Sequence, residues 1–330
     1  MGTVSEKLTS FVVIAYNEEA AIARNLQAIM KLEGLADYEV VVVDDASRDR
    51  TAEIVAAVSS GNPRVRLIRL PENRGRGYAR YQGVRAARGD LIAMVDADIS
   101  LPENWLVQAC GALPGHDAVG GTAVPDGDVA YICKRFALVP RVIPHATTVT
   151  GSNGLFRRGV FDVVHYNPEL REGEDVSLNH AMADHQLSAA VVPGLLVRHE
   201  ERKTFRESLV WLFVSGQGAT RQLLTFRRLR QPDTATAAFV GTLVIGLLLV
   251  LVGQSQIAVG PPTALTLATS AAHLRSRFEL RQSKWHVIAR AVAVDSLLLL
   301  AYFCGRLVGL SLLWRTLQPR RGAAEVTDPA

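Results

Sequence analysis

Two aspartates one residue apart, Asp96 and Asp98, follow directly on the apolar run at residues 91–95. Successive strand side chains point to opposite faces, so both carboxylates can serve one site only if the backbone turns at this point. Mg²⁺ and Mn²⁺ prefer oxygen ligands, and Mg²⁺ is often held by one or two carboxylates together with substrate phosphates. The pair therefore predicts a divalent cation bridged to a diphosphate, with a solvated turn or helix cap as the alternative.

Strand-like and helix-like patterns alternate through residues 9–100. Short apolar, mostly β-branched runs occupy residues 11–14, 39–43, 65–68 and 91–95, and helical patterns lie at 22–29 and 78–87. The alternation predicts an α/β fold of βαβ units with a mainly parallel central sheet. The apolar strands indicate that both faces of this sheet are covered.

Polar residues follow three of these strands at the point where each strand ends. In parallel sheets of this kind, ligands bind beyond the carboxyl ends of the strands. We therefore expect one ligand-binding edge, formed by Tyr16, Asp44, Asp45, Asp96 and Asp98.

The C-terminal third of the 330-residue chain is apolar. Residues 234–274 contain no Asp, Glu, Lys or Arg, and this run is about twice the roughly 20 residues that cross a bilayer once. The polar residues 254–256 and Pro261-Pro262 interrupt it, which suggests two spans, and residues 291–314 suggest a third that contains Asp295 and Arg306. The alternative is a set of buried core helices in a soluble protein.

The flanking residues predict which side of the membrane the catalytic part occupies. Residues 1–10 are polar and the apolar run 11–15 is too short for a signal peptide, so this part should stay in the cytoplasm. Basic residues before the first span and after the second indicate cytoplasmic ends. A third crossing would put Arg315, Arg320 and Arg321 outside, which leaves two or three spans open. The three cysteines lie far apart, which is typical of a reducing compartment.

Five motifs, taken together, resemble a family 2 glycosyltransferase of the GT-A fold over roughly residues 9–200. Each motif is weak alone, whereas five in the right order are specific. Ala15 departs from the family pattern, since many members have a proline-containing turn there. In chain order the motifs are Ala15-Tyr16-Asn17-Glu18-Glu19, Val43-Asp44-Asp45-Ala46-Ser47-Arg48-Asp49-Arg50-Thr51, Asn73-Arg74-Gly75-Arg76-Gly77, Asp96-Ala97-Asp98 and Gly173-Glu174-Asp175.

The resemblance implies inverting transfer from a nucleotide-diphosphate sugar, with UDP or GDP as the nucleotide. Tyr16 and Glu18 would border the base and ribose, and Asp44 or Asp45 would accept hydrogen bonds from one of them. Arg80 would face the diphosphate, with a solvated helix arginine as the alternative reading.

The resemblance also implies a metal site and a base. Asp98 would ligate Mn²⁺ or Mg²⁺, with Asp96 at the ribose or the metal's water shell, and His199 would complete the coordination unless it is an ordinary strand-end histidine. Asp175 would deprotonate the acceptor hydroxyl. Glu174 is the neighbour that could be confused with it, and an acidic helix start is the simpler explanation of both.

Residues 208–228 predict an amphipathic helix on the membrane surface. The stretch from Gln217 to Gln222 lacks the Gln-x-x-Arg-Trp motif of processive polysaccharide synthases. The region is more similar to membrane-anchored transferases of exopolysaccharide assembly, of the succinoglycan type, which extend lipid-linked oligosaccharides by single sugars.

These features predict a multi-pass inner-membrane protein. Its expected parts are a cytoplasmic GT-A catalytic domain (1–205), an interfacial helix or linker (206–232), a transmembrane region (233–316, with spans at about 235–253, 256–274 and 291–314) and a polar tail (317–330).

The predicted function is transfer of one sugar to a hydroxyl of a lipid-linked or membrane-proximal glycan. The alternative enzyme is a polyprenyl-phosphate sugar synthase, whose phosphate acceptor is already ionised and needs no base. A non-catalytic scaffold that binds nucleotide sugars is a further alternative. A nucleotidyltransferase is disfavoured, because no glycine-rich basic loop opens the first strand turn, and no nucleic acid partner is expected.

Overall fold

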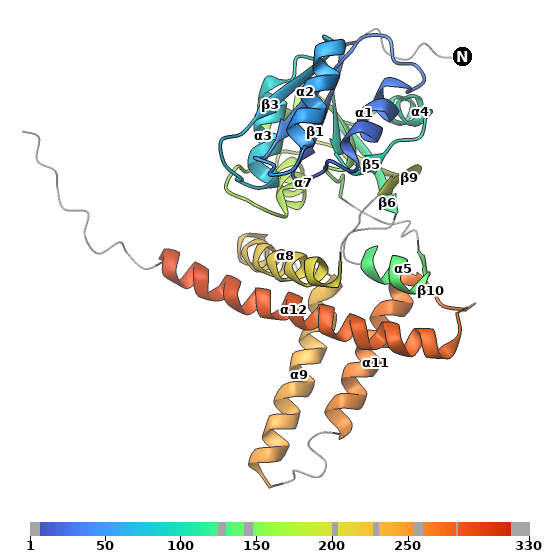
Figure 1. The fold of residues 1–330 in the computed structure, drawn as a ribbon. Helices are drawn as coiled ribbons and strands as arrows, with labels where there is room; N and C mark the ends of the chain where they lie inside the picture. Colours follow the sequence, from blue (N-terminus) through green and yellow to red (C-terminus); the bar gives the residue numbers. More distant parts are fainter. Residues whose placement is uncertain are drawn as a thin grey trace, which may run out of the picture.

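The protein consists of an N-terminal α/β domain followed by long helices (Figure 1). The structure, a computed structural model, describes residues 7–124, 130–141, 148–199, 204–226, 231–253, 260–281 and 283–317. The sheet of the α/β domain has eight strands in the order β3-β2-β1-β4-β8-β6-β9-β5.

Four parallel strands form one side of this sheet: β1 (Thr9–Ala15), β2 (Tyr38–Asp44), β3 (Val65–Arg69) and β4 (Leu91–Asp96). They coincide with the four runs in the sequence, so the predicted α/β architecture is confirmed. Their carboxyl ends meet at one edge, because β1 pairs in register with both β2 and β4.

The other side of the sheet is mixed, so the sheet as a whole is mostly parallel, as predicted, with antiparallel pairings on this side only. Strand β8 (Asn153–Arg157) runs antiparallel to both β4 and β6 (Ala118–Val124), and β9 (Ala189–His199) runs parallel to β6. The two-residue strand β5 (Ile99–Ser100) follows β4 after a tight turn and pairs antiparallel with β9. That turn between β4 and β5 contains Ala97 and Asp98.

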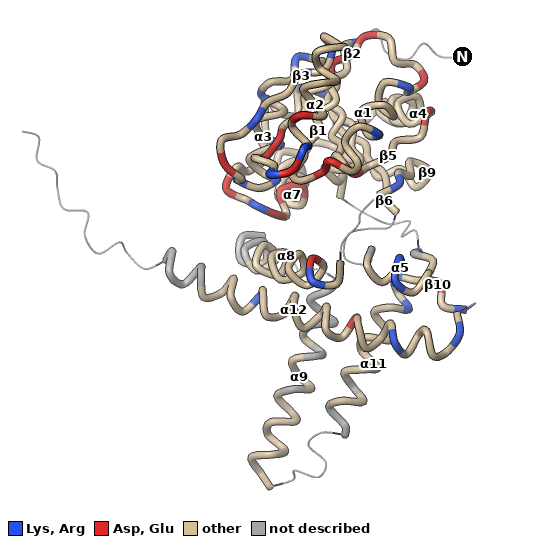
Figure 2. Tube along the Cα trace, viewed as in Figure 1, with Lys and Arg blue, Asp and Glu red and all other residues tan. Residues whose placement is uncertain are grey.

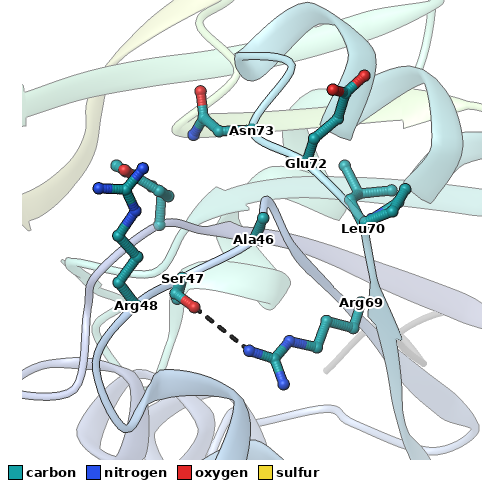
Figure 3. A pocket seen from close by; sticks show the side chains of 9 residues that line it. Ala46, Ser47, Arg48, Arg69, Leu70, Glu72 and Asn73 are labelled. Carbon is teal, nitrogen blue, oxygen red and sulfur yellow. Dashed lines mark hydrogen bonds between the residues drawn. The ribbon is translucent and has the colours of Figure 1, made fainter.

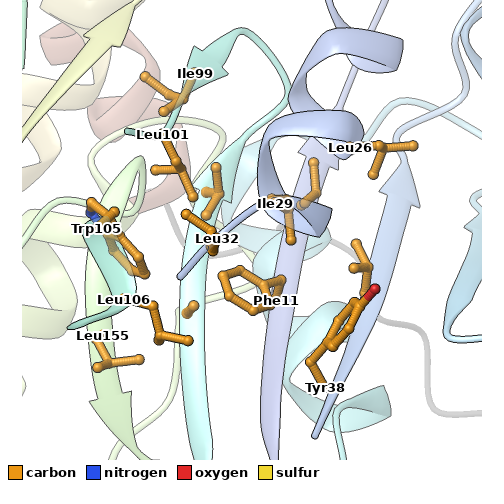
Figure 4. Close-up of a cluster of buried hydrophobic side chains, with 14 of the residues drawn as sticks. Phe11, Leu26, Ile29, Leu32, Tyr38, Ile99, Leu101, Trp105, Leu106 and Leu155 are labelled. Atoms are coloured by element: carbon orange, nitrogen blue, oxygen red, sulfur yellow. The ribbon is translucent and has the colours of Figure 1, made fainter. Parts of the chain in front are cut away.

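Helices cover both faces of the sheet, as the apolar strands predict. On one face, Phe11 and Val13 of β1 pack with α1 (Ile22–Met30) and α4 (Trp105–Ala112), as Figure 4 shows for Phe11, Leu26, Ile29 and Trp105. On the other face, Val12 and Ile14 pack with α3 (Arg76–Ala86) and with the clusters around it. The remaining helices of the domain are α2 (Thr51–Gly61), α6 (Val160–Val163) and α7 (Glu174–Asp184). Helix α5 (Ala130–Phe136) instead lies with the C-terminal helices, where Ile132 packs in a cluster with Leu274 and Tyr302 (Figure 1).

The C-terminal helices lie on one side of the α/β domain. Helix α8 (Phe205–Phe226) lies between that domain and α12 (Trp285–Leu317), whereas α9 (Gln231–Leu251) and α11 (Gly260–Arg277) project away from it (Figure 1). A two-stranded sheet pairs β7 (Val139–Pro140) with β10 (Phe278–Glu279). Glycines allow α8 and α12 to cross closely, because a Cβ at Gly216 would strike the Tyr302 carbonyl and one at Gly305 the Phe213 carbonyl.

The number of apolar helices corrects the expectation of spans at about 235–253, 256–274 and 291–314. Among the described residues, one helix is long and apolar enough to cross a membrane, the Trp285–Ser311 part of α12. Helix α9 contributes only the shorter apolar stretch Val240–Leu251. An uncharged run is not always an apolar one, and α11 contains several Thr and Ser residues and His273. The turn expected at residues 254–256 and the tail from residue 318 lie outside the described residues.

Candidate functional site

A cavity of about 830 Å³ opens at the carboxyl ends of β1 and β4. It brings together residues that are up to 204 positions apart, since its lining extends from Ile14 to Gly218. Eight of the predicted site residues line this cavity: Tyr16, Glu18, Asp45, Arg80, Asp96, Asp98, Asp175 and His199. Asp44 is fully buried beside it. The roles assigned to these residues stay predictions, whereas their proximity is a property of the fold.

Asp98 and His199 form a direct pair across this cavity. Antiparallel pairing of β5 with β9 sets Ile99 opposite His199, which brings the histidine beside the preceding Asp98. The His199 Nε2 to Asp98 Oδ2 distance is 2.8 Å, and both side chains are largely buried.

Asp96 belongs to a buried network centred on Arg80. The Arg80 guanidinium donates to Asp96 Oδ1 at 2.7 Å, to Glu174 Oε1 at 2.9 Å and to the Gly151 carbonyl at 2.6 Å. A Cβ at position 151 would collide with this guanidinium, so glycine is needed there. Arg80 lines the cavity, and three of its donors are committed to protein groups, two of them carboxylates; its predicted place at the diphosphate stays a prediction.

The donor set near the Asp96–Asp98 turn fits a divalent cation that also binds substrate phosphates. Asp98 offers an oxygen and His199 a nitrogen, and Asp96 keeps its second oxygen clear of the Arg80 bond. Among the described residues there is no group of three or more His, Cys, Asp or Glu side chains arranged to hold a metal alone. Mg²⁺ is commonly bound by one or two carboxylates plus substrate phosphates, so a site this sparse is sufficient.

The two aspartates at the end of β2, Asp44 and Asp45, differ in their partners. Both oxygens of Asp45 accept backbone N–H groups, from Arg74 and Gly75, each at 2.8 Å. Asp45 therefore ties the end of β2 to the loop before α3. Asp44 Oδ1 accepts the Ser47 N–H at 3.2 Å, and its Oδ2 lies 3.4 Å from Arg69 Nε. Unlike Asp45, Asp44 therefore has one carboxylate oxygen, Oδ2, that accepts no backbone N–H group.

A second opening of about 630 Å³ adjoins these aspartates, and Tyr16 borders both openings. The Tyr16 side chain is 41% exposed, so its ring is accessible for stacking. Figure 3 shows Arg48 and Arg69 on either side of Ser47, with Glu72 and Asn73 across from them. Arg69 donates to the Ser47 carbonyl at 3.3 Å.

The opposite side of the main cavity is formed by the start of α7. Gly173 precedes this helix with φ of 77°, a left-handed conformation that suits glycine. Burial raises the pKa of Asp175, and the negative charge of Glu174 raises it further. Burial would also raise the pKa of Glu174, but Arg76 and Arg80 hold it below its ordinary value. Environments that separate the pKa values of two neighbouring acids are typical of acid–base sites.

Helix α8 contributes an apolar wall to the same cavity. Val210, Trp211 and Val214 line it, and Gly218 lies against the Glu172 carbonyl. The sequence predicted this helix as an amphipathic surface element. Its contribution to the cavity was not predicted.

Two further cavity residues were missed from the sequence, Arg76 and Arg171. Arg76 Nη2 lies 3.5 Å from Glu172 Oε1. Burial would lower the pKa of Arg76, but the charges of Glu174, Glu172 and Asp96 raise it above its ordinary value. A signal was available, because Arg76 stands in the first turn of α3, where the helix dipole disfavours a cation.

Comparison with known proteins adds a family and a fold. Residues 10–164 match the model described as Glycosyl transferase family 2. The chain is 51% identical over 89 residues to the succinoglycan biosynthesis protein ExoO of Rhizobium meliloti, which is 27% of this chain and 25% of that protein. It is 36% identical over 148 residues to an undecaprenyl-phosphate 4-deoxy-4-formamido-L-arabinose transferase of Pseudomonas aeruginosa, 43% of each. The matches thus span less than half of either relative.

A solved structure matches nearly the whole chain. The mannosyltransferase PcManGT from Pyrobaculum calidifontis, in complex with GDP-Man and Mn²⁺, superposes with a TM-score of 0.62. The match covers 92% of this chain and 88% of that one at 22% sequence identity. At this identity the match establishes a shared fold.

Proposed function

Because the chain belongs to glycosyl transferase family 2 through residues 10–164 and has a GT-A-like fold, we propose that it is an inverting, metal-dependent sugar transferase. It moves one sugar from a UDP- or GDP-linked donor to a hydroxyl of a lipid-linked or membrane-proximal glycan. The observation that carries this proposal is the shared cavity, in which Asp98, His199 and Asp175 line one space with an apolar helix as its wall.

The donor would lie along the strand ends. Tyr16 would offer a ring face for the base, Glu18 would lie beside the ribose, and Asp45, which lines the cavity where Asp44 is fully buried, would accept a hydrogen bond from one of them in addition to its two backbone N–H groups. Arg76, which is 39% exposed at its side chain, is better placed than the buried Arg80 to meet the diphosphate. Arg80 instead fixes Asp96 and Glu174.

Asp98 and His199, with the second oxygen of Asp96, would hold the cation. A bound Mn²⁺ or Mg²⁺ supplies Lewis-acid stabilisation of the departing diphosphate. PcManGT, an enzyme of the same fold, forms a complex with both Mn²⁺ and a nucleotide sugar, which supports this assignment.

Asp175 would act as the base in a single displacement. The acceptor oxygen attacks the anomeric carbon, its proton passes to the Asp175 carboxylate, and the bond between that carbon and the diphosphate oxygen breaks. The raised pKa of Asp175 makes its carboxylate a better proton acceptor than an ordinary aspartate. Glu174 is committed to Arg80 at 2.9 Å, which disfavours it as the base.

The C-terminal helices would attach the enzyme to the inner membrane with the catalytic domain in the cytoplasm. The apolar length of α12 supports an anchor. The exposed apolar side chains of α9, including Leu247, Leu248 and Leu251, support entry of a second element into the lipid. Figure 2 shows charged residues spread over the α/β domain, and the sequence of α9 has no charged residue from Thr234 to Leu251. The apolar wall formed by Val210, Trp211 and Val214 of α8 would then lie where a membrane-bound acceptor arrives.

The test is a donor screen on the purified full-length protein. Nucleoside diphosphate release is measured for UDP- and GDP-linked sugars with Mn²⁺ and membrane lipid extract, and again after chelation by EDTA. We expect one donor to give release that needs both metal and extract. Release from no donor, or release unchanged by EDTA, would contradict the proposal.

A polyprenyl-phosphate sugar synthase is the second candidate. Two cations, Arg76 and Arg171, line the cavity together with Asp175, which would suit an anionic acceptor. The similarity to an undecaprenyl-phosphate transferase points the same way. A phosphate acceptor needs no base, so the effect of Asp175→Asn on transfer separates the two functions.

A further inference from the structure

Lys and Arg residues gather at one end of the helical region, away from the main cavity. Lys134 and Arg135 belong to α5, and five more Lys or Arg lie in residues 275–290, from the end of α11 to the first turns of α12. Figure 2 shows both groups at the same end of the helices. None of these residues lines the cavity that contains Asp98 and Asp175. The sugar transfer proposed above therefore leaves them without a role.

Backbone pairing brings the two groups together. Strand β7, which follows α5, pairs with β10, which follows α11. Beside this pair, the Arg141 backbone N–H donates to the Arg277 carbonyl at 2.8 Å, and the Arg141 Nε donates to the Phe278 carbonyl at 2.9 Å. Ile132 of α5 also packs in one apolar cluster with Leu274 of α11. The cations of α5 and β7 are thus fixed beside those of the turn between α11 and α12, although the two segments are far apart in the sequence.

The charge of these segments is one-sided. Residues 130–141 and 275–290 contain eight Lys or Arg and a single acid, Glu279, whereas the whole chain has 36 Lys or Arg and 32 Asp or Glu. A surface with this bias attracts a polyanion or an anionic surface. Seven of the eight cations are exposed, and together they are called the basic surface: Lys134, Arg135, Arg141, Arg275, Arg281, Lys284 and Arg290.

The two helices beside the basic surface carry exposed apolar side chains that give way to cations. On α12, Arg290, Ala293 and Leu297 are exposed, and their spacing of three and four residues places them on one face of the helix. On α11, the exposed Leu267 precedes the exposed Arg275. Both helices thus change from apolar to basic toward the turn that joins them. This change is typical of segments that leave a bilayer, because long cationic side chains there reach the headgroups.

We propose that the basic surface binds the headgroups of anionic phospholipids in the membrane that α12 enters. The inference rests on the membrane attachment proposed above and adds a selectivity for lipid charge. Lys and Arg beside a membrane-inserted helix are attracted to the negative surface of a leaflet rich in anionic lipids. A guanidinium can also bind a phosphate through two hydrogen bonds. A nucleic acid would meet the same positive charge, but it offers no contact to the exposed apolar side chains of α11 and α12.

The test is equilibrium binding of fluorescent phosphatidylglycerol to the purified full-length protein in a non-ionic detergent. Phosphatidylcholine with the same acyl chains is the neutral reference. We expect a preference for phosphatidylglycerol that falls as the salt concentration rises, because salt screens exposed charges. The triple variant Arg281→Gln/Lys284→Gln/Arg290→Gln should weaken phosphatidylglycerol binding about tenfold, the effect of losing one hydrogen bond between charged groups. Its binding of phosphatidylcholine should be unchanged.

Two further variants separate headgroup binding from other effects. Arg24→Gln/Lys31→Gln/Arg64→Gln removes the same charge from exposed positions on the α/β domain, so it should bind both lipids as the wild type does. Arg281→Lys/Arg290→Lys keeps the charge of the basic surface and should keep the preference for phosphatidylglycerol. Loss of the preference in this variant would mean that the arginines support the fold, and it would contradict the proposal.

Three other results would overturn the proposal. The first is equal binding of the two lipids by the wild type, and the second is equal binding of phosphatidylglycerol by the wild type and the triple glutamine variant. The third is tighter binding of a short RNA than of phosphatidylglycerol, lost in the same variant, which would assign the surface to nucleic acid. Binding of neither lipid would contradict the membrane attachment as well. The donor screen measures sugar transfer alone, so its failure and the failure of this proposal are distinguishable.

Discussion

The two halves of the main cavity are built differently. The proposed donor half (Tyr16, Asp45, Asp96, Asp98 and His199) comes mostly from the ends of adjacent parallel strands and is polar. The proposed acceptor half (Gly173, Asp175, Val210, Trp211 and Val214) combines the start of α7 with helix α8, which also packs on α12, and one of its walls is apolar. The donor half thus follows from local pattern, whereas the acceptor half depends on how distant elements dock.

Arg80 and Glu174 join the two halves. Arg80 contacts Asp96 on one side and Glu174, the neighbour of Asp175, on the other. Variants that act on one half alone can therefore be separated from variants that act on the joint between them.

The largest effect on the donor half is expected from Asp98→Asn. Loss of a metal-binding carboxylate removes several kcal/mol of transition-state stabilisation, so transfer should fall by about 10³-fold or more. Steady-state rates with Mn²⁺ measure this loss. Asp90→Asn, at the exposed opposite end of β4, is the control and should keep full activity. Equal rates for wild type and Asp98→Asn would remove Asp98 from the donor half.

The joint between the halves should be sensitive to Arg80→Met. Two buried carboxylates would lose their cation, and breaking a buried ion pair typically costs about 3–5 kcal/mol. Denaturant unfolding measures this loss of stability. Arg50→Met is the control, because Arg50 and Glu53 form an exposed pair, each side chain 75% exposed, and such pairs contribute little. A loss no greater than that of the control would mean that the network does not hold the halves together.

In the acceptor half, Trp211→Ala should weaken binding of the acceptor and leave the affinity for the donor unchanged. The substitution removes the apolar contact between the indole ring and the lipid acceptor, so the KM for that acceptor should rise roughly tenfold. Trp285→Ala, at a side chain that is 79% exposed, serves as the control. If the donor affinity changes instead, Trp211 belongs to the other half.

The smallest effect is expected in the pH profile. The base must be ionised to accept a proton, so kcat/KM falls as the pH drops through the raised pKa of Asp175. This acid limb of the pH profile should lie at a higher pH than the pKa of an ordinary aspartate would give. Glu174→Gln removes a negative neighbour and should move the limb to lower pH. A limb that moves upward or stays in place would contradict the assigned coupling.

The sequence predicted which strand-end residues lie together, because strand periodicity and strand-end carboxylates are local features. His199 could be suggested from its residue type, but only the β5–β9 register explains its proximity to Asp98. Arg80 was expected at the diphosphate. The sequence places Arg80 on the helix after the glycine loop, but it does not show which group its guanidinium contacts. In the structure the guanidinium donates to Glu174 and Gly151, which are far along the chain.

The helical region was harder to predict for a different reason. Absence of charge over residues 234–274 was taken as apolar length, yet the Thr and Ser residues of α11 reduce its hydropathy. The amphipathic pattern of α8 was recognisable. Which surface covers its apolar stripe depends on tertiary docking, so the Trp211 wall could not be inferred from periodicity.

The most direct test of the central claim compares Asp175→Asn with wild type in two assays on the same preparation. One assay measures donor affinity with Mn²⁺, and the other measures sugar transfer to membrane lipid extract. Asp184→Asn, an exposed aspartate at the other end of α7, is the matched control. We predict unchanged donor affinity and a loss of transfer of about 10²- to 10⁴-fold for Asp175→Asn alone. Transfer at the wild-type rate by Asp175→Asn would contradict the role of Asp175 as base and favour a lipid phosphate as the acceptor.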